Sequence, residues 1–166
     1  GDFFYSRKTL SVQTIQYTNR FLDLLEDNCI SMVMILGNHD IVHNATSELS
    51  AAKELLHRHV AIYDSPRTFG KLDLIPWINS GNKSKFESLL ASSTNSKIAV
   101  GHFDILGAKF AKHGIVSHHG LEPSMFSHYE LVLSGHFHTK SQIGNIHYLG
   151  SPFQFTWADW NDTKWL

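Results

Sequence analysis

Apolar residues recur along the chain with two different spacings, which predict an alternation of helices and strands. Apolar residues at every third or fourth position predict amphipathic helices at 11–26, from Thr46 or Ser47 onward, and at 84–92. Ser11 is a suitable N-cap for the first of these helices. We expect the apolar residues of that helix, from Val12 to Leu25, to pack in the core.

Short apolar runs rich in β-branched residues predict the strands. Isolated runs lie at 29–36, 60–63, 97–100 and 131–133, and paired runs around Gly70 and Gly144 predict two hairpins. The length and the Ile/Val content of 29–36 predict a strand that is buried on both faces. Strands alternating with helices, followed by strands in hairpins, predict an α/β fold in which two sheets pack together with helices outside.

Composition and charge narrow the class of protein. The 166 residues fit one domain with a sizeable core, and a formal net charge of −1 provides no global positive field for nucleic acid. Cys29, the single cysteine, excludes an internal disulfide and favours a reducing compartment. No apolar run has the length of a membrane span, and the N-terminus does not resemble a signal peptide. Because the chain lacks an initial Met and ends in an aromatic stretch, we expect it to be an internal piece of a longer protein.

Four segments place ligand-type side chains directly after a glycine at the end of an apolar strand, although for the first segment that strand is only inferred to lie upstream. They are Gly1-Asp2, Gly37-Asn38-His39-Asp40, Gly101-His102 and Gly135-His136-Phe137-His138. Side chains that are scattered in the sequence but lie at the same rim of a sheet can converge on one point. The four segments together therefore predict one site.

The donor atoms of this predicted site are oxygen and imidazole nitrogen, without thiolate. Such a set argues against a structural zinc of the cysteine type and favours manganese, iron or catalytic zinc. A carboxylate can bridge two ions about 3.5–4 Å apart, and such a pair stabilises the attacking and leaving oxygens of an in-line displacement at phosphorus. The chemistry therefore suggests hydrolysis of phosphate esters.

In their order along the chain, these four segments resemble the motifs of the calcineurin-like metallophosphoesterases. Finer features resemble the SbcD-type DNA repair nucleases, nearest to the recombination endonuclease subunits of tailed phages. These features are Gly1-Asp2-Phe3-Phe4 with Arg7-Lys8, Leu74-Ile75-Pro76-Trp77, His119-Gly120-Leu121-Glu122-Pro123 and Gly150-Ser151-Pro152. The resemblance covers nearly all of 1–166. It implies one partial nuclease domain, a β-sandwich of two mixed sheets flanked by helices, without the first βα unit, the capping region or the ATPase-docking segment.

The resemblance also implies a role for each site residue. Asp2 would bridge two divalent ions, most plausibly manganese, with iron or zinc as alternatives. Asn38, His102 and His136 would complete the second metal site, and His138 would serve the first. His39 would face the scissile phosphate, and Asp40 would orient His39. The Asp-x-His motif of the first strand is absent from this chain. The first ion therefore keeps only Asp2 and His138, and we expect that site to be weakened.

The function implied is hydrolysis of DNA phosphodiesters, as an exonuclease and endonuclease subunit in recombination and repair. Its partners would be DNA, an SbcC-type ATPase and a second copy of the chain. No membrane would be involved, and the protein would act in the cytoplasm of the host cell if it is phage-encoded. A phosphatase or nucleotide phosphodiesterase is one alternative, which the near-neutral charge mildly favours, whereas 74–77 and 119–123 favour the nuclease. A scaffold with a degraded metal site is another, and the retained histidines speak against it.

Two segments have simple structural interpretations. We expect 103–126 to be a solvated loop, with a role over the active site as the alternative. We expect the aromatic stretch 153–165 to be a last strand packed on the core, with stacking on DNA as the alternative.

Overall fold

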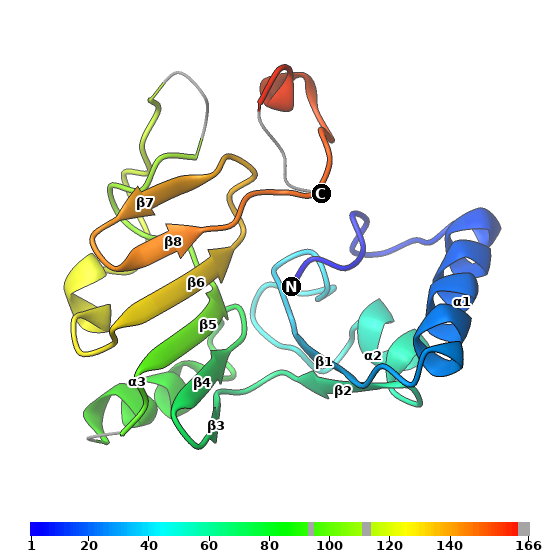
Figure 1. The fold of residues 1–166 in the computed structure, drawn as a ribbon, viewed down its shortest axis with the longest axis horizontal. Coiled ribbons are helices and arrows are strands. Elements are labelled where there is room, and N and C mark those ends of the chain that lie inside the picture. The colour runs from blue at the N-terminus through cyan, green and yellow to red at the C-terminus, as the bar shows by residue number, and fades with distance from the viewer. Residues whose placement is uncertain (93–94, 111–113, 163–166) are drawn as a thin grey trace.

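The computed structural model describes residues 1–92, 95–110 and 114–162 as an α/β protein with a two-stranded and a six-stranded sheet (Figure 1). The helices are α1 (Val12–Asp27), α2 (Ala51–Leu56) and α3 (Lys83–Ala91), with 3-10 turns at Pro123–Phe126 and Trp157–Asp159. The strands are β1 (Met32–Ile35), β2 (Val60–Tyr63), β3 (Arg67–Phe69), β4 (Leu72–Ile75), β5 (Ile98–His102), β6 (Leu131–Gly135), β7 (Ser141–Ile143) and β8 (Ile146–Tyr148). Among the described residues, no helix is long and apolar enough to cross a membrane.

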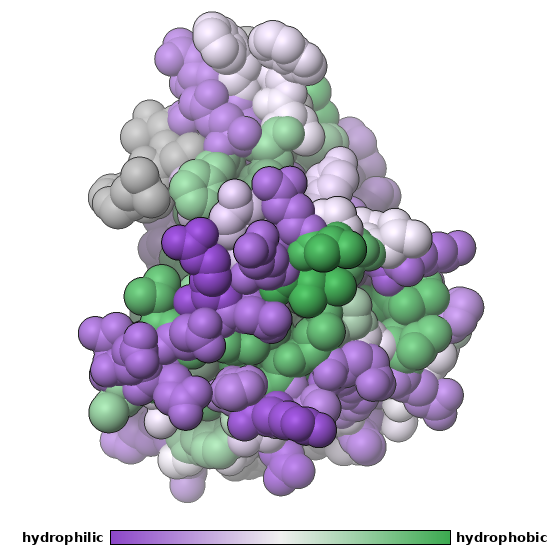
Figure 2. Space-filling view, turned by 90° about the vertical axis from the view of Figure 1, so that its right-hand side faces the viewer, coloured by the Kyte–Doolittle hydropathy of each residue, from purple (hydrophilic) through white to green (hydrophobic). Residues whose placement is uncertain are grey.

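Helix α1 confirms the predicted bounds, and its N-terminus has a side-chain cap. The Ser11 hydroxyl accepts a hydrogen bond from the Thr14 amide, which satisfies one of the unpaired donors of the first turn. Leu22 is buried, but Val12 and Leu24 are 84% and 60% exposed. The expectation that all apolar residues of this helix pack in the core was therefore wrong, because the core covers only one stripe of the helix. Figure 2, which views the molecule from the right-hand side of Figure 1, shows apolar surface among polar side chains on this face.

Strands β1 and β2 form a small parallel sheet joined by a crossover through α2. The second helix begins at Ala51 rather than near Thr46, because Ser50 caps it by accepting from the Lys53 amide. The smaller core lies between this sheet, α1 and α2. Its buried residues are Phe4, Leu22, Met34, Leu36, Ile41, Ala52, Leu56 and Val60.

The larger sheet has the strand order β3-β4-β5-β6-β8-β7, with β4, β5, β6 and β8 parallel and the edge strands β3 and β7 antiparallel. Both predicted hairpins, β3-β4 and β7-β8, are confirmed. The two predicted sheets are present, but only the larger one is mixed. The smaller sheet is parallel because its two strands are connected by a helix rather than by a turn. Strand β1 is also not buried on both faces as expected, since Val33 is exposed.

The carboxyl ends of the two sheets are tied together at the backbone. The Trp77 amide, just after β4, donates to the Leu36 carbonyl, just after β1, at 2.8 Å. In the larger sheet, His102 of β5 pairs in register with Gly135 of β6. Because the parallel strands end at the same edge, the segments that follow β1, β4, β5 and β6 lie next to one another.

Two segments differ from the expectation at the sequence level. The expected loop 103–126 contributes Phe103, Ile105, Ala108 and Phe126 to the larger core, so it is not simply solvated. Periodicity did not reveal this contribution to the core, because these apolar residues have neither helical nor strand spacing. His118 and His119 are exposed, as expected, whereas Lys112 and His113 lie outside the described residues.

The ends of the described chain form no strands. Residues 1–4 have no strand geometry, and the strand inferred to lie upstream of Gly1 stays a prediction. The aromatic stretch was also wrongly predicted as a core strand, since Phe153, Phe155 and Trp160 are more than half exposed and Trp157 is 88% exposed. Its local structure is a 3-10 turn with a capping box between Thr156 and Asp159. Trp165 lies outside the described residues.

Candidate metal centre

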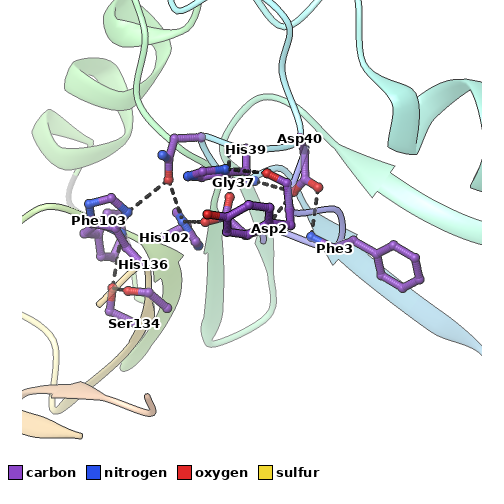
Figure 3. A network of polar contacts seen from close by, with 12 residues as sticks. Asp2, Phe3, Gly37, His39, Asp40, His102, Phe103, Ser134 and His136 are labelled. Atoms are coloured by element: carbon purple, nitrogen blue, oxygen red, sulfur yellow. Dashed lines mark hydrogen bonds and ion pairs between the residues drawn. The ribbon is translucent and has the colours of Figure 1, made fainter. Parts of the chain in front are cut away.

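Four of the predicted site residues meet between the two sheets and form what we call the cluster: Asp2, Asn38, His102 and His136. Asp2 comes from the N-terminal segment, Asn38 from the turn after β1, His102 from the end of β5 and His136 from the residue after β6. In the described part of the chain, Asp2, His102 and His136 are the group of acidic and histidine side chains whose ligand atoms all lie within 4.8 Å of one another. Figure 3 shows these three side chains turned toward one another.

The atoms that face each other in the cluster are all able to bind a cation. His102 Nε2 lies 3.0 Å from Asp2 Oδ2 and 3.0 Å from Asn38 Oδ1. His136 Nδ1 lies 3.0 Å from the same Asn38 oxygen. One nitrogen hydrogen on His102 cannot serve two oxygens fully, whereas a cation among these atoms would satisfy all four. Two imidazole nitrogens, one carboxylate and one amide oxygen also fit the preferences of manganese, iron or zinc.

Two residues of the cluster have backbone conformations that residues other than glycine rarely adopt. The φ angles are 58° for Asp2 and 84° for His136, both in the left-handed region. Such conformations cost about 1–3 kcal/mol each and occur where the surroundings enforce them, often at functional sites. The strained backbone therefore coincides with the residues whose side chains converge.

Asp40 holds the N-terminal segment against the turn after β1. Its carboxylate accepts hydrogen bonds from the amides of Asp2 at 2.6 Å, Phe3 at 2.8 Å and Gly37 at 2.8 Å (Figure 3). Burial raises the pKa of the Asp40 carboxyl, and the bond from the Gly37 amide opposes this effect. The resemblance assigned to Asp40 the orientation of His39. In the structure, Asp40 instead enforces the backbone of Asp2, and another group holds the His39 ring.

The glycines of the four segments are required for space rather than for a sharp turn. None of Gly1, Gly37, Gly101 and Gly135 is among the glycines of positive φ. A Cβ atom on Gly37 would collide with the Asp2 carboxylate, and one on Gly135 would lie 2.9 Å from His102 Nδ1. These glycines thus allow the backbone to approach the cluster closely.

The electrostatics of the cluster keep its ligand atoms unprotonated near neutral pH. Burial lowers the pKa of His102, and burial together with the neighbouring His102 lowers the pKa of His136 to about 4. For Asp2, burial acts to raise the pKa, but the contacts with His102 and with the His39 amide outweigh it and bring the pKa to about 2. A neutral imidazole and an ionised carboxylate are the forms that bind a metal.

His39 lies beside the cluster, with its ring held by Tyr5. The Tyr5 carbonyl lies 2.8 Å from His39 Nδ1, and the two rings stack with centroids 5.8 Å apart. The His39 amide donates to Asp2 Oδ1 at 2.7 Å, so His39 is fixed relative to the cluster. His39 and Asp2 line a cavity of about 110 Å³ together with His138 and Phe155. The structure therefore places His39 next to the cluster but outside the converging ligand atoms.

His138 is two residues from His136 but does not join the cluster. Its side chain is 39% exposed, and its Nδ1 lies 3.4 Å from the carboxylate of the buried Asp159. It shares the cavity of Asp2 and His39. We call His39 and His138 the rim, because they line the cavity that the cluster borders.

Three residues at this site were not recognised in the sequence as parts of it. Tyr5 holds His39, Asp159 contacts His138, and Trp77 packs its ring against those of His136 and His102, with centroids 5.0 and 6.2 Å away. The Thr156-x-x-Asp159 spacing is a capping-box signature that could have located Asp159. Tyr5 acts through its backbone carbonyl, for which the sequence carries no signal.

The fold and the site define an α/β protein with a candidate divalent-metal centre at the carboxyl ends of its parallel strands. No protein-family model matches the chain. Among curated proteins, the chain is similar to exonuclease subunit 1 of Enterobacteria phage T4, with 36% identity over 170 residues. The match covers 99% of this chain and 49% of the relative, so the chain spans about half the length of that relative.

Proposed function

We propose that this chain is the nuclease domain of a metal-dependent DNA exonuclease and endonuclease subunit, with the SbcD-like metallophosphoesterase fold. The convergence of Asp2, Asn38, His102 and His136 on one point carries the proposal, because it provides the ligands of a divalent ion. The name of the phage T4 relative supports DNA as the substrate.

The cluster would hold one ion, and Asp2 with His138 would hold a second, weaker one. The shared cavity of Asp2, His39 and His138 supports this second position. The resemblance favours manganese, and the mixture of oxygen and imidazole ligands suits manganese, iron or zinc. When bound, such ions lower the pKa of a bound water and stabilise the charge on phosphoryl oxygens.

Of the two rim residues, His39 acts on the substrate. Because Tyr5 binds Nδ1 of His39, the other ring nitrogen is the one left to meet a phosphodiester in the cavity. From there it stabilises the charge that develops on the phosphate or protonates the leaving oxygen. Asp40 and Tyr5 position the groups that take part, Asp40 through the backbone of Asp2 and Tyr5 through the ring of His39.

We further propose that the protein works in a complex. The word "subunit" in the name of the T4 relative supports a multi-subunit assembly. Its partners would be an SbcC-type ATPase and a second copy of this protein, in the cytoplasm of the host.

The proposal is tested by assaying duplex DNA, single-stranded DNA and bis(p-nitrophenyl) phosphate side by side with Mn²⁺. We expect hydrolysis of DNA that stops with a chelator and is lost in His136→Ala. His59→Ala, an exposed histidine outside the site, serves as the matched control and should retain wild-type activity. Turnover of the small ester but not of DNA would favour the phosphatase alternative and contradict the nuclease.

A further inference from the structure

A cavity of about 280 Å³ borders the cluster and shares no lining residue with the cavity at the rim. Its walls are mostly apolar, and Trp77, Ile78, Phe103 and Leu121 form them. His102 also lines this cavity, while its Nε2 faces Asp2 and Asn38 in the cluster. A ligand in the cavity would therefore be in contact with one of the residues that surround the candidate metal.

We propose that this cavity binds the base of the nucleotide next to the scissile phosphate. The inference rests on the proposed function and adds a specificity site to it. An aromatic and aliphatic wall suits the flat, apolar face of a nucleobase, and stacking of this kind tolerates any base sequence. Because His102 belongs to both places, a base in the cavity has its phosphate beside the cluster.

Trp77 is the residue that connects the cavity to the metal centre. Its ring packs against the rings of His136 and His102, and its amide is bound to the Leu36 carbonyl. The indole is thus held at the backbone and lies between the cavity and two metal-ligand candidates. Such a fixed wall can position a base without being reorganised when the base enters.

The lining of this cavity also carries charged groups of both signs. Lys83 brings a positive charge to the lining, and the Asp104 carboxylate lies in the lining with its oxygens in contact with His119 Nδ1 and the Ser117 hydroxyl. The contact with His119 Nδ1 is 2.7 Å long, so the 81% exposed His119 ring is held near the cavity. Lys83, which lines the cavity, can meet the phosphate of the neighbouring nucleotide.

A base can enter the cavity only after it has left the stack of a duplex. Unstacking costs least for a mismatched or already single-stranded nucleotide. The cavity therefore favours DNA ends whose terminal bases are unpaired or frayed.

The test compares binding of deoxyadenosine monophosphate with that of deoxyribose 5-phosphate, which lacks the base. We expect calorimetry on the intact protein with Mn²⁺ to show about tenfold tighter binding of the nucleotide, within the range expected for stacking of one base. Leu121→Trp fills the cavity and should reduce this ratio to about twofold or less. Ile78→Phe fills it from another wall and provides a second variant if Leu121→Trp does not fold.

The matched control is Leu74→Trp, which enlarges a side chain in a separate apolar groove that shares no lining residue with the cluster. It should keep the tenfold ratio. Equal binding of the two ligands to the wild type, or an unchanged ratio in both filled variants, would overturn the base site. Hydrolysis of DNA by the wild type with Mn²⁺ reports separately on the proposed function, so its absence would overturn that function rather than the cavity assignment.

Discussion

His136 and His138 are separated by one residue but belong to two different regions of the molecule. His136 lies in the cluster, where it contacts Asn38 and packs against Trp77 and His102. His138 lies at the rim, partly exposed and in contact with Asp159. The comparison shows that a His-x-His pair does not by itself define one site, because each ring takes its role from the segment that faces it. In our account the cluster holds the tightly bound metal, whereas at the rim His39 meets the substrate and His138 serves the weaker metal position.

The largest effect should come from the rim. His39→Ala removes the ring that faces the phosphodiester but keeps the hydrogen bond that the amide of residue 39 donates to the Asp2 carboxylate, so kcat should fall about 10³-fold, as for loss of a general acid. Metal content should stay at the wild-type level when it is measured on the same sample by atomic emission. Loss of the metal in this variant would place His39 in the cluster and break the division between the two regions.

The next effect concerns the support of the cluster. Asp40→Ala leaves the amides of Asp2, Phe3 and Gly37 without their acceptor, and we expect the free energy of unfolding to drop by about 3 kcal/mol. Denaturant unfolding in a chelator measures this change without a contribution from the metal. Asp23→Ala, an exposed acidic residue on α1, should change stability by less than about 0.5 kcal/mol. An equally small change for Asp40→Ala would show that the amides find other partners.

A smaller effect concerns how acid changes the stability of the metal-free protein. The pKa of His136 is about 4 in the folded protein, below its ordinary value of 6.5, so the unfolded chain binds a proton between these values that the folded chain does not. Lowering the pH through this window therefore favours unfolding. Between about pH 7 and pH 5 the contribution of His136 should amount to about 1–2 kcal/mol in a chelator. His136→Ala should remove this contribution to the pH dependence of stability. An unchanged pH dependence in the variant would contradict the assignment of His136 as a buried, neutral imidazole.

The smallest effect tests how the rim is positioned. Tyr5→Leu removes the ring that stacks on His39 but keeps the carbonyl that binds Nδ1, so we expect kcat to fall only about threefold. Steady-state kinetics on DNA measure this change. A loss as large as that of His39→Ala would mean that the stacked ring, rather than the carbonyl, fixes the imidazole.

The sequence allowed the α/β class, both hairpins and the helical bounds of α1 and α3 to be predicted, because each follows from local periodicity or from a turn. It also located Asp2, Asn38, His102 and His136, because each follows a glycine at a predicted or inferred strand end. The resemblance assigned His136 and His138 to different metal positions, whereas the His-x-His pattern alone does not separate them, since their surroundings depend on Trp77 and Asp159, which lie far away in the sequence. The exposure of Val12 and of the aromatic stretch was also misjudged, because apolar composition does not reveal whether another segment covers a side chain.

The central claim is that the cluster, and not the rim, holds the tightly bound ion. Titration of Mn²⁺ into the wild type, His136→Ala and His138→Ala by calorimetry tests this claim most directly. We predict that His136→Ala weakens the tighter binding event by at least about 100-fold and that His138→Ala changes it by less than about threefold. Equal weakening in both variants, or wild-type binding in His136→Ala, would contradict the account.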